Sequence, residues 1–291
     1  MIKRGIAHVG VFFLYLLSLL LPLSLLFFFA RLLYYLLYYI IGYRKKVVRQ
    51  NLTQSFPEKS LTEIKTIEKK FFLYLAELIF EIIKMTSISR AETLKRVKFT
   101  GLEQLETHFK AGESVLACTG HYGNWELGTL ALGLSISAKT MVIYKPINNK
   151  IFETWFDCMR TKYGNVFIAM RQTLRGMATY KNEPTLLCFA SDQSPTREET
   201  KYFVNFLHQQ TAALLGVEKI AKSTKRPIYY FKVSVVKKGY YHVEVLPMCL
   251  DPAKMDEFAI TNLHFKFLED IIKEQPQYWL WSHKRWKFKP E

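Results

Sequence analysis

Residues 114–133 read SVLACTGHYGNWELGTLALG, and this stretch decides the fold class. Its first part, Ser114 to Thr119, is a short apolar run, which is typical of a buried strand. Its last part, Asn124 to Gly133, has the length and the leucine content of a helix. The stretch therefore predicts a strand that turns directly into a helix.

The turn between these elements carries a histidine and a carboxylate, His121 and Glu126. On one continuous helix a separation of five residues would turn the two side chains about 140° apart. We therefore expect His121 to precede the helix, where Gly120 and Gly123 allow a tight turn. Glu126 would then accept the ring N–H of His121, which is the arrangement of an oriented general base. The alternative is a helix-capping histidine beside a surface glutamate.

Strand and helix patterns alternate along the rest of the chain. Strands are predicted at Thr140–Tyr144, Val166–Ala169 and Thr185–Ala190, helices at Leu61–Met85, Asn148–Tyr163 and Thr173–Lys181, and a hairpin at Ile228–Val236 and Tyr240–Leu246. This alternation predicts an α/β fold with a largely parallel, helix-covered sheet. Ligands bind such sheets beyond the carboxyl ends of the strands. His121, Asp192 and Gln193 follow strand ends on that side, where Asp192 and Gln193 either bind substrate or form a structural turn.

The N-terminal segment predicts a membrane anchor. The 21 residues from Val9 to Phe29 contain no Asp, Glu, Lys or Arg, and as a helix they would span about 31 Å, close to the thickness of the hydrocarbon core. We expect a membrane helix with a kink at Pro22, since the run is too long for a cleaved signal peptide. Leu32 to Tyr43 predicts an interfacial helix, because tyrosines favour the headgroup level and a basic cluster follows. A buried core helix is the alternative there.

The charge distribution supports the same division. The formal net charge is +16, and seven Lys or Arg residues but no Asp or Glu precede Glu58. Such an excess favours an anionic membrane surface or an acidic partner, and without a nucleic-acid-binding module we expect no nucleic acid. We expect residues 1–50 to form the anchor and residues 51–291 a catalytic domain that faces the cytosol.

Cofactor motifs are missing from the sequence. The four cysteines have no Cys-x-x-Cys spacing, which suits buried thiols in a reducing compartment. No His-Glu-x-x-His motif or glycine-rich phosphate loop occurs, so we expect neither a metal nor another cofactor.

Five blocks carry a resemblance to known enzymes. His121 and Glu126 resemble the His-x4-Asp/Glu signature of glycerolipid-type acyltransferases. Over most of its length the chain also resembles the late acyltransferases of lipid A biosynthesis, the lauroyl and myristoyl transferase type. The further blocks are Gly42-Tyr43-Arg44 with Asn51-Leu52 and Phe56-Pro57, then Tyr144 to Lys150, Ser191 to Ser194, and Gln277 to Lys287. Many relatives have Arg in place of Lys145, and Asp or Asn in place of Ser194.

The resemblance implies a sheet of the glycerolipid acyltransferase type and an inner-membrane enzyme. It would move a fatty acyl chain from an acyl carrier protein thioester to a hydroxyl of a lipid A precursor, with His121 as the base and Glu126 orienting it. Expected substrate-binding residues are Lys145, Arg160, Arg171, Asp192 and Gln193, where the arginines either meet a phosphorylated acceptor or are solvated. A lysophospholipid or an aminoacyl lipid is the alternative acceptor. A membrane-tethered lipid-binding protein without catalysis is the alternative of another class.

Overall fold

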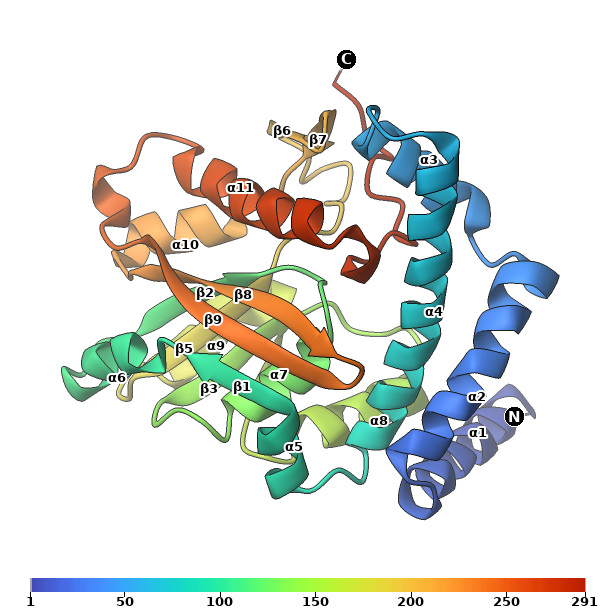
Figure 1. The fold of residues 1–291 in the computed structure, drawn as a ribbon. Coiled ribbons are helices and arrows are strands. Elements are labelled where there is room, and N and C mark those ends of the chain that lie inside the picture. The colour runs from blue at the N-terminus through green and yellow to red at the C-terminus, as the bar shows by residue number, and fades with distance from the viewer. Residues whose placement is uncertain (1, 291) are drawn as a thin grey trace.

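A seven-stranded sheet forms the centre of the molecule (Figure 1). The structure is a computed structural model that describes residues 2–290. The strand order is β1-β9-β8-β2-β5-β3-β4. The strands are β1 Val97–Thr100, β2 Val115–Thr119, β3 Lys139–Tyr144, β4 Val166–Ala169, β5 Thr185–Ala190, β8 Ile228–Lys237 and β9 Tyr240–Cys249.

The sheet confirms the predicted α/β class and each of the predicted strands. Neighbouring strands from β8 to β4 in this order pair in parallel, as do β1 and β9, whereas β8 and β9 form an antiparallel hairpin. Residues 115–118 of β2 are all buried, because a central parallel strand is covered on both faces. β1 was not predicted, since Val-Lys-Phe-Thr is too short to show a pattern.

Helices cover both faces of the sheet. Figure 1 shows α10 and α11 on one face and α7 on the other, with α4 standing across the end of the sheet. The helices beyond the N-terminal segment are α3 Lys45–Ser55, α4 Leu61–Met85, α5 Arg90–Arg96, α6 Leu102–Lys110, α7 Trp125–Leu132, α8 Lys150–Thr161, α9 Thr173–Thr179, α10 Gly216–Thr224 and α11 Ala259–Glu274. α4 has the predicted bounds, because the Ser60 hydroxyl and the Glu63 carboxylate form a capping box at its start.

The N-terminal segment differs from the prediction of one helix over Val9–Phe29. The segment forms α1 Ile2–Leu20 and α2 Leu23–Tyr35, which continues as a π-helical turn, η1 Leu36–Ile41. The chain breaks before Pro22, which has no N–H to continue α1. Nζ of Lys84 in α4 donates to the carbonyls of Ser18 and Leu21, at 2.6 and 3.0 Å, and so caps the broken end.

One described helix, Leu23–Ile41, is long and apolar enough to cross a membrane. It has a mean hydropathy of 1.8, and only 17% of it is buried. The predicted interfacial stretch from Leu32 is therefore continuous with this helix and does not form a separate one.

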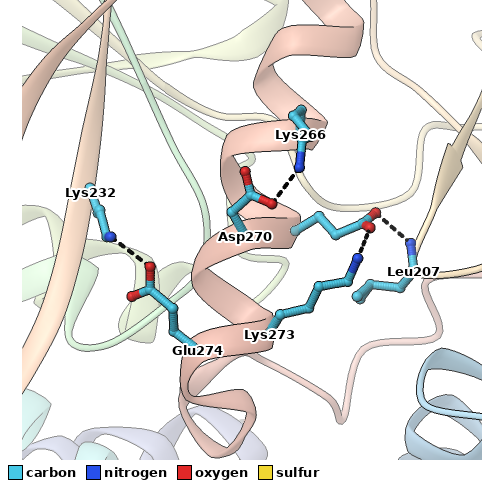
Figure 2. A network of polar contacts seen from close by, with 7 residues as sticks. Leu207, Lys232, Lys266, Asp270, Lys273 and Glu274 are labelled. Atoms are coloured by element: carbon cyan, nitrogen blue, oxygen red, sulfur yellow. Dashed lines mark hydrogen bonds and ion pairs between the residues drawn. The ribbon is translucent and has the colours of Figure 1, made fainter. Parts of the chain in front are cut away.

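A second, two-stranded sheet was also not predicted. β6 Phe203–Phe206 and β7 Gln209–Ala212 form an antiparallel hairpin near α11. Glu269 of α11 holds this hairpin by accepting the Leu207 N–H at 2.8 Å. On the same helix Lys266 pairs with Asp270, and Glu274 pairs with Lys232 of β8 at 2.7 Å (Figure 2). α11 thus connects the small hairpin to the main sheet.

Candidate active site

His121 lies on the turn between β2 and α7, and two glycines make this turn feasible. A Cβ atom on Gly120 would lie 2.5 Å from Cδ1 of Leu268 in α11. Gly123 has a φ of +60°, and a Cβ atom there would lie 2.8 Å from Cγ1 of Val233. Neither position has room for a larger residue, so the two glycines let the turn lie against α11 and the sheet.

Asp192 is the hydrogen-bond partner of His121. Nδ1 of His121 lies 2.6 Å from Oδ1 of Asp192, and the His121 backbone N–H donates to Oδ2 at 3.0 Å. Nε1 of Trp279 donates to the same Oδ2 at 2.8 Å. The register of the sheet explains this approach: Thr119 of β2 pairs with Ala190 of β5 in parallel, and each reactive residue follows two positions later.

The two side chains change one another's pKa. Burial by itself raises the pKa of a carboxyl group and lowers that of an imidazole. Here the opposite charge and the hydrogen bonds outweigh burial, so the pKa of Asp192 lies well below its usual range and the pKa of His121 is raised. Because Nδ1 faces the carboxylate, the neutral ring carries its free lone pair on Nε2.

The other ring nitrogen of His121 is open to a ligand. The side chain is 18% exposed, and within residues 2–290 no hydrogen bond to Nε2 is formed. The ring of Trp125 packs edge-on against the imidazole, with 4.9 Å between the centroids. His121 can therefore accept a proton at Nε2 while Asp192 fixes the orientation of its ring.

Glu126 does not accept the ring N–H of His121, in contrast to the prediction. Arg160 of α8 binds both of its oxygens, with Nε donating to Oε2 at 2.8 Å and Nη2 to Oε1. α7 begins at Trp125, so Glu126 lies in its first turn and faces α8. The negative charge of Glu126 still contributes to the raised pKa of His121.

The structure separates the five predicted substrate-binding residues. Asp192 and half-buried Gln193 lie beside His121. Arg160 is held by Glu126 and lies over the ring of Phe156, at 4.8 Å, so it is not available to a phosphate. Lys145 follows β3, the strand next to β5, and Arg171 follows β4, the strand beyond it. Both residues are exposed and lie along the same edge of the sheet as Asp192.

The segment after α11 completes the site. Trp279 of this segment is buried against Asp192. The backbone N–H of Ser194 donates to Nε2 of His283 at 3.1 Å, and burial lowers the pKa of His283 to about 4. The aromatic content of residues 277–287 was the only local signal for this role.

A buried carboxyl group lies behind the turn. Oε2 of Glu81 in α4 accepts hydrogen bonds from Nδ2 of Asn124 at 2.8 Å and from the hydroxyl of Tyr241 at 2.6 Å. The side chain of Asn124 in turn caps α7 by accepting the N–H of Leu127. Burial raises the pKa of Glu81 to about 7. α4 therefore fixes the start of the helix that follows His121.

Known proteins of one family are similar to this chain over most of its length. The family model described as bacterial lipid A biosynthesis acyltransferase matches residues 1–288. A lipid A biosynthesis palmitoleoyltransferase of Escherichia coli is 24% identical over 250 residues, which cover 85% of this chain and 80% of the relative. A lipid A biosynthesis acyltransferase of Haemophilus influenzae is 23% identical over 83% of this chain and 76% of the relative. A lipid A biosynthesis lauroyltransferase of Escherichia coli is 22% identical over 85% of this chain and 80% of the relative.

Proposed function

The chain belongs to the bacterial lipid A biosynthesis acyltransferases, and we propose that it transfers a fatty acyl chain from an acyl carrier protein thioester to a hydroxyl of a lipid A precursor. The single observation that carries this proposal beyond the family is the His121–Asp192 pair, with Nε2 open at the carboxyl edge of the sheet. This edge is where ligands bind in parallel α/β sheets.

The proposed reaction needs one base and no acyl-enzyme. Nε2 of His121 takes the proton of the acceptor hydroxyl as its oxygen attacks the thioester carbonyl. The tetrahedral intermediate then expels the carrier thiolate, which receives the proton from the imidazolium. Asp192 keeps the ring in the tautomer with Nδ1–H and stabilises the imidazolium, as a carboxylate does in serine hydrolases. A general base of this kind contributes about 10²- to 10⁴-fold to the rate.

The oxyanion needs hydrogen-bond donors near the start of α7. The N–H of Leu127 is taken by the side chain of Asn124. The N–H groups of Trp125 and Glu126 remain as donors in the first turn, at the positive end of the helix dipole. We propose that they stabilise the negative oxygen of the intermediate.

The proposed location is the inner membrane, with the anchor in residues 1–50 and the catalytic domain in residues 51–291 facing the cytosol. Support comes from the apolar helix Leu23–Ile41 and from the basic residues that follow it. A lipid acceptor with several acyl chains stays in the bilayer, whereas an acidic carrier protein arrives from the cytosol. The net charge of +16 favours both encounters.

The test is acyl transfer by purified protein, with defined acyl carrier protein thioesters and a lipid A precursor, read by mass spectrometry. We expect the acceptor to gain the mass of one acyl chain, and His121→Ala to lower turnover at least about 10²-fold. Near-normal transfer by His121→Ala would reject the mechanism. Acylation of a lysophospholipid or an aminoacyl lipid instead would reject the acceptor.

A further inference from the structure

A cavity of about 470 Å³ lies between η1, α4 and the C-terminal segment. Four aliphatic side chains line it: Leu37, Leu75, Ile79 and Leu280. Arg44 and His283 lie in the same wall. The lining therefore combines aliphatic side chains with one permanently charged group, which is the chemistry that suits an amphiphile.

The cavity adjoins the catalytic pair through the C-terminal segment. His283 lines the cavity, and its Nε2 accepts the N–H of Ser194, two residues beyond Asp192. His283 also lies close enough to His121 and Asp192 for their charges to affect its pKa. A ligand in the cavity thus lies next to the segment that carries the catalytic carboxylate.

Arg44 supplies the charge in the cavity. None of the described residues that line it is acidic, and His283 is neutral at pH 7 because burial lowers its pKa to about 4. Nη1 of Arg44 donates to the carbonyl of Ser282 at 3.0 Å. This bond orients the guanidinium and leaves its other N–H groups for an anion, which they can bind in a bidentate way.

The backbone at Arg44 is strained. Arg44 has a φ of +49°, in the left-handed region that residues other than glycine rarely adopt. It follows η1, a π-helical turn, and such turns are frequent at functional sites. Strain of this kind persists where the surrounding structure needs it. Here it places the guanidinium against the C-terminal segment.

The outer side of η1 connects the cavity to the apolar surface of the N-terminal helices. Leu37 faces the cavity, while Tyr39, Ile40 and Ile41 of the same turn are exposed. The cavity and the exposed apolar surface thus share one helical turn.

We propose that this cavity binds the acceptor lipid. One of the lipid's existing acyl chains packs against the four aliphatic side chains, and a phosphate of its headgroup binds Arg44. The inference rests on the proposed function and names the site that holds the acceptor. It also gives a role to Arg44 of the Gly42-Tyr43-Arg44 block and to Leu280, which the catalytic pair leaves unexplained.

Variants that fill the cavity test the acyl-chain site. The probe is a bis-phosphorylated, tetra-acylated glucosamine disaccharide, and the donor is an acyl carrier protein thioester. Leu280→Trp and Ile79→Trp, on two different elements, should each raise the acceptor KM at least about tenfold, with kcat and the donor KM within about twofold. Leu250→Trp, at an exposed position outside the cavity, is the control and should change neither KM.

Removing the charge tests the headgroup site. Arg44→Gln should raise the KM for the phosphorylated probe about tenfold but leave the KM for the same disaccharide without phosphates unchanged. Arg175→Gln, at an exposed arginine of α9, is the matched control. An equal effect on both probes would show that Arg44 acts on the fold and not on an anion, and would overturn this part of the proposal.

Direct binding separates this inference from the proposed function. Equilibrium binding of the radiolabelled probe is measured in detergent for the His121→Ala protein with and without each cavity change. A variant counts as folded when its thermal unfolding midpoint equals that of the His121→Ala protein. Unchanged affinity in folded Leu280→Trp and Ile79→Trp variants would overturn the cavity assignment, even if acyl transfer is normal. Lost affinity would support it even if the unaltered protein transferred no acyl group, an outcome that would reject only the proposed function.

Discussion

At the scale of single residues, the carboxylate that orients His121 comes from a neighbouring strand and not from the adjacent helix. The five-residue spacing to Glu126 suggested a local pair, but the ring N–H meets Asp192. A sequence spacing describes neighbours along one element, whereas the parallel register of β2 and β5 brings together residues 71 positions apart.

Replacing Asp192 tests this assignment. Asp192→Asn removes the charge that raises the pKa of His121, so we expect kcat to fall at least about 10²-fold. A base works in its unprotonated form, so the rise of kcat/KM with pH should move to lower pH as the pKa of His121 falls. The pH profile of acyl transfer measures both effects, with Asp251→Asn at an exposed position as the control. An unchanged profile would contradict the pairing.

Glu126 and Arg160 should act mainly on stability. Glu126→Gln leaves the buried guanidinium of Arg160 without its countercharge, which we expect to lower the free energy of unfolding by about 3 kcal/mol. The double variant Glu126→Leu/Arg160→Met should regain part of that loss, because neither charge remains buried. Urea denaturation of the unaltered protein, Glu126→Leu, Arg160→Met and the double variant gives the coupling energy of the pair. Additive effects would show that the pair is energetically independent.

At the scale of elements, local signals predicted those boundaries that local chemistry fixes. α4 begins at its capping box and ends at Met85, as expected. The break at Pro22 was expected only as a kink. The sequence does not show that Lys84 of α4 and Ser87, which follows the helix, would satisfy the polar groups of a separated α1.

The turn between β6 and β7 stores strain. Leu207 and His208 have φ of +50° and +61°, although a two-residue hairpin turn of this type favours Asn-Gly. His208→Gly should therefore raise the free energy of unfolding by about 1 kcal/mol, because glycine adopts positive φ without steric cost. Asn205→Gly, in β6 with ordinary backbone, should lower it by a similar amount. Equal changes in denaturation midpoint would refute this account of the turn.

The contact between α4 and α7 should depend on pH. The pKa of Glu81 is raised from 4.5 to about 7, so the folded protein holds a proton there that the unfolded chain releases. The contribution of Glu81 to the free energy of unfolding is fully present below pH 4.5. As the pH rises through 7, the free energy of unfolding falls by about 1–3 kcal/mol. Glu81→Gln cannot titrate, so its unfolding free energy should fall less than that of the unaltered protein between pH 5 and pH 8. Parallel curves would contradict the buried position of Glu81.

At the scale of the whole molecule, exposed apolar side chains concentrate at one place. Of the 23 large hydrophobic residues whose described side chains are exposed, 16 lie between Val9 and Tyr43. An apolar surface of this size marks a membrane or protein interface. The basic residues from Arg44 onward lie next to it, as expected for a headgroup layer.

Charges on this apolar surface should release the protein from membranes. Phe12 and Phe28 are 62% and 58% exposed, and Phe12→Asp/Phe28→Asp should lower the partition into vesicles of phosphatidylethanolamine and phosphatidylglycerol at least about tenfold. Val236→Asp, 66% exposed on β8, is the control. Flotation of reconstituted protein measures the partition, and equal flotation of all three proteins would show that the surface does not contact lipid.

The sequence by itself determined the α/β class, the central strands, the bounds of α4 and the position of His121 at the end of a strand, because periodicity, capping and turn residues act over short distances. It also indicated the family, through blocks of residues spread along the chain. Only the tertiary structure decided which carboxylate meets His121, why Glu126 binds Arg160, and how Arg44 and His283 come to line one cavity. Those contacts depend on strand register and on helices packed from distant segments, which no local pattern encodes.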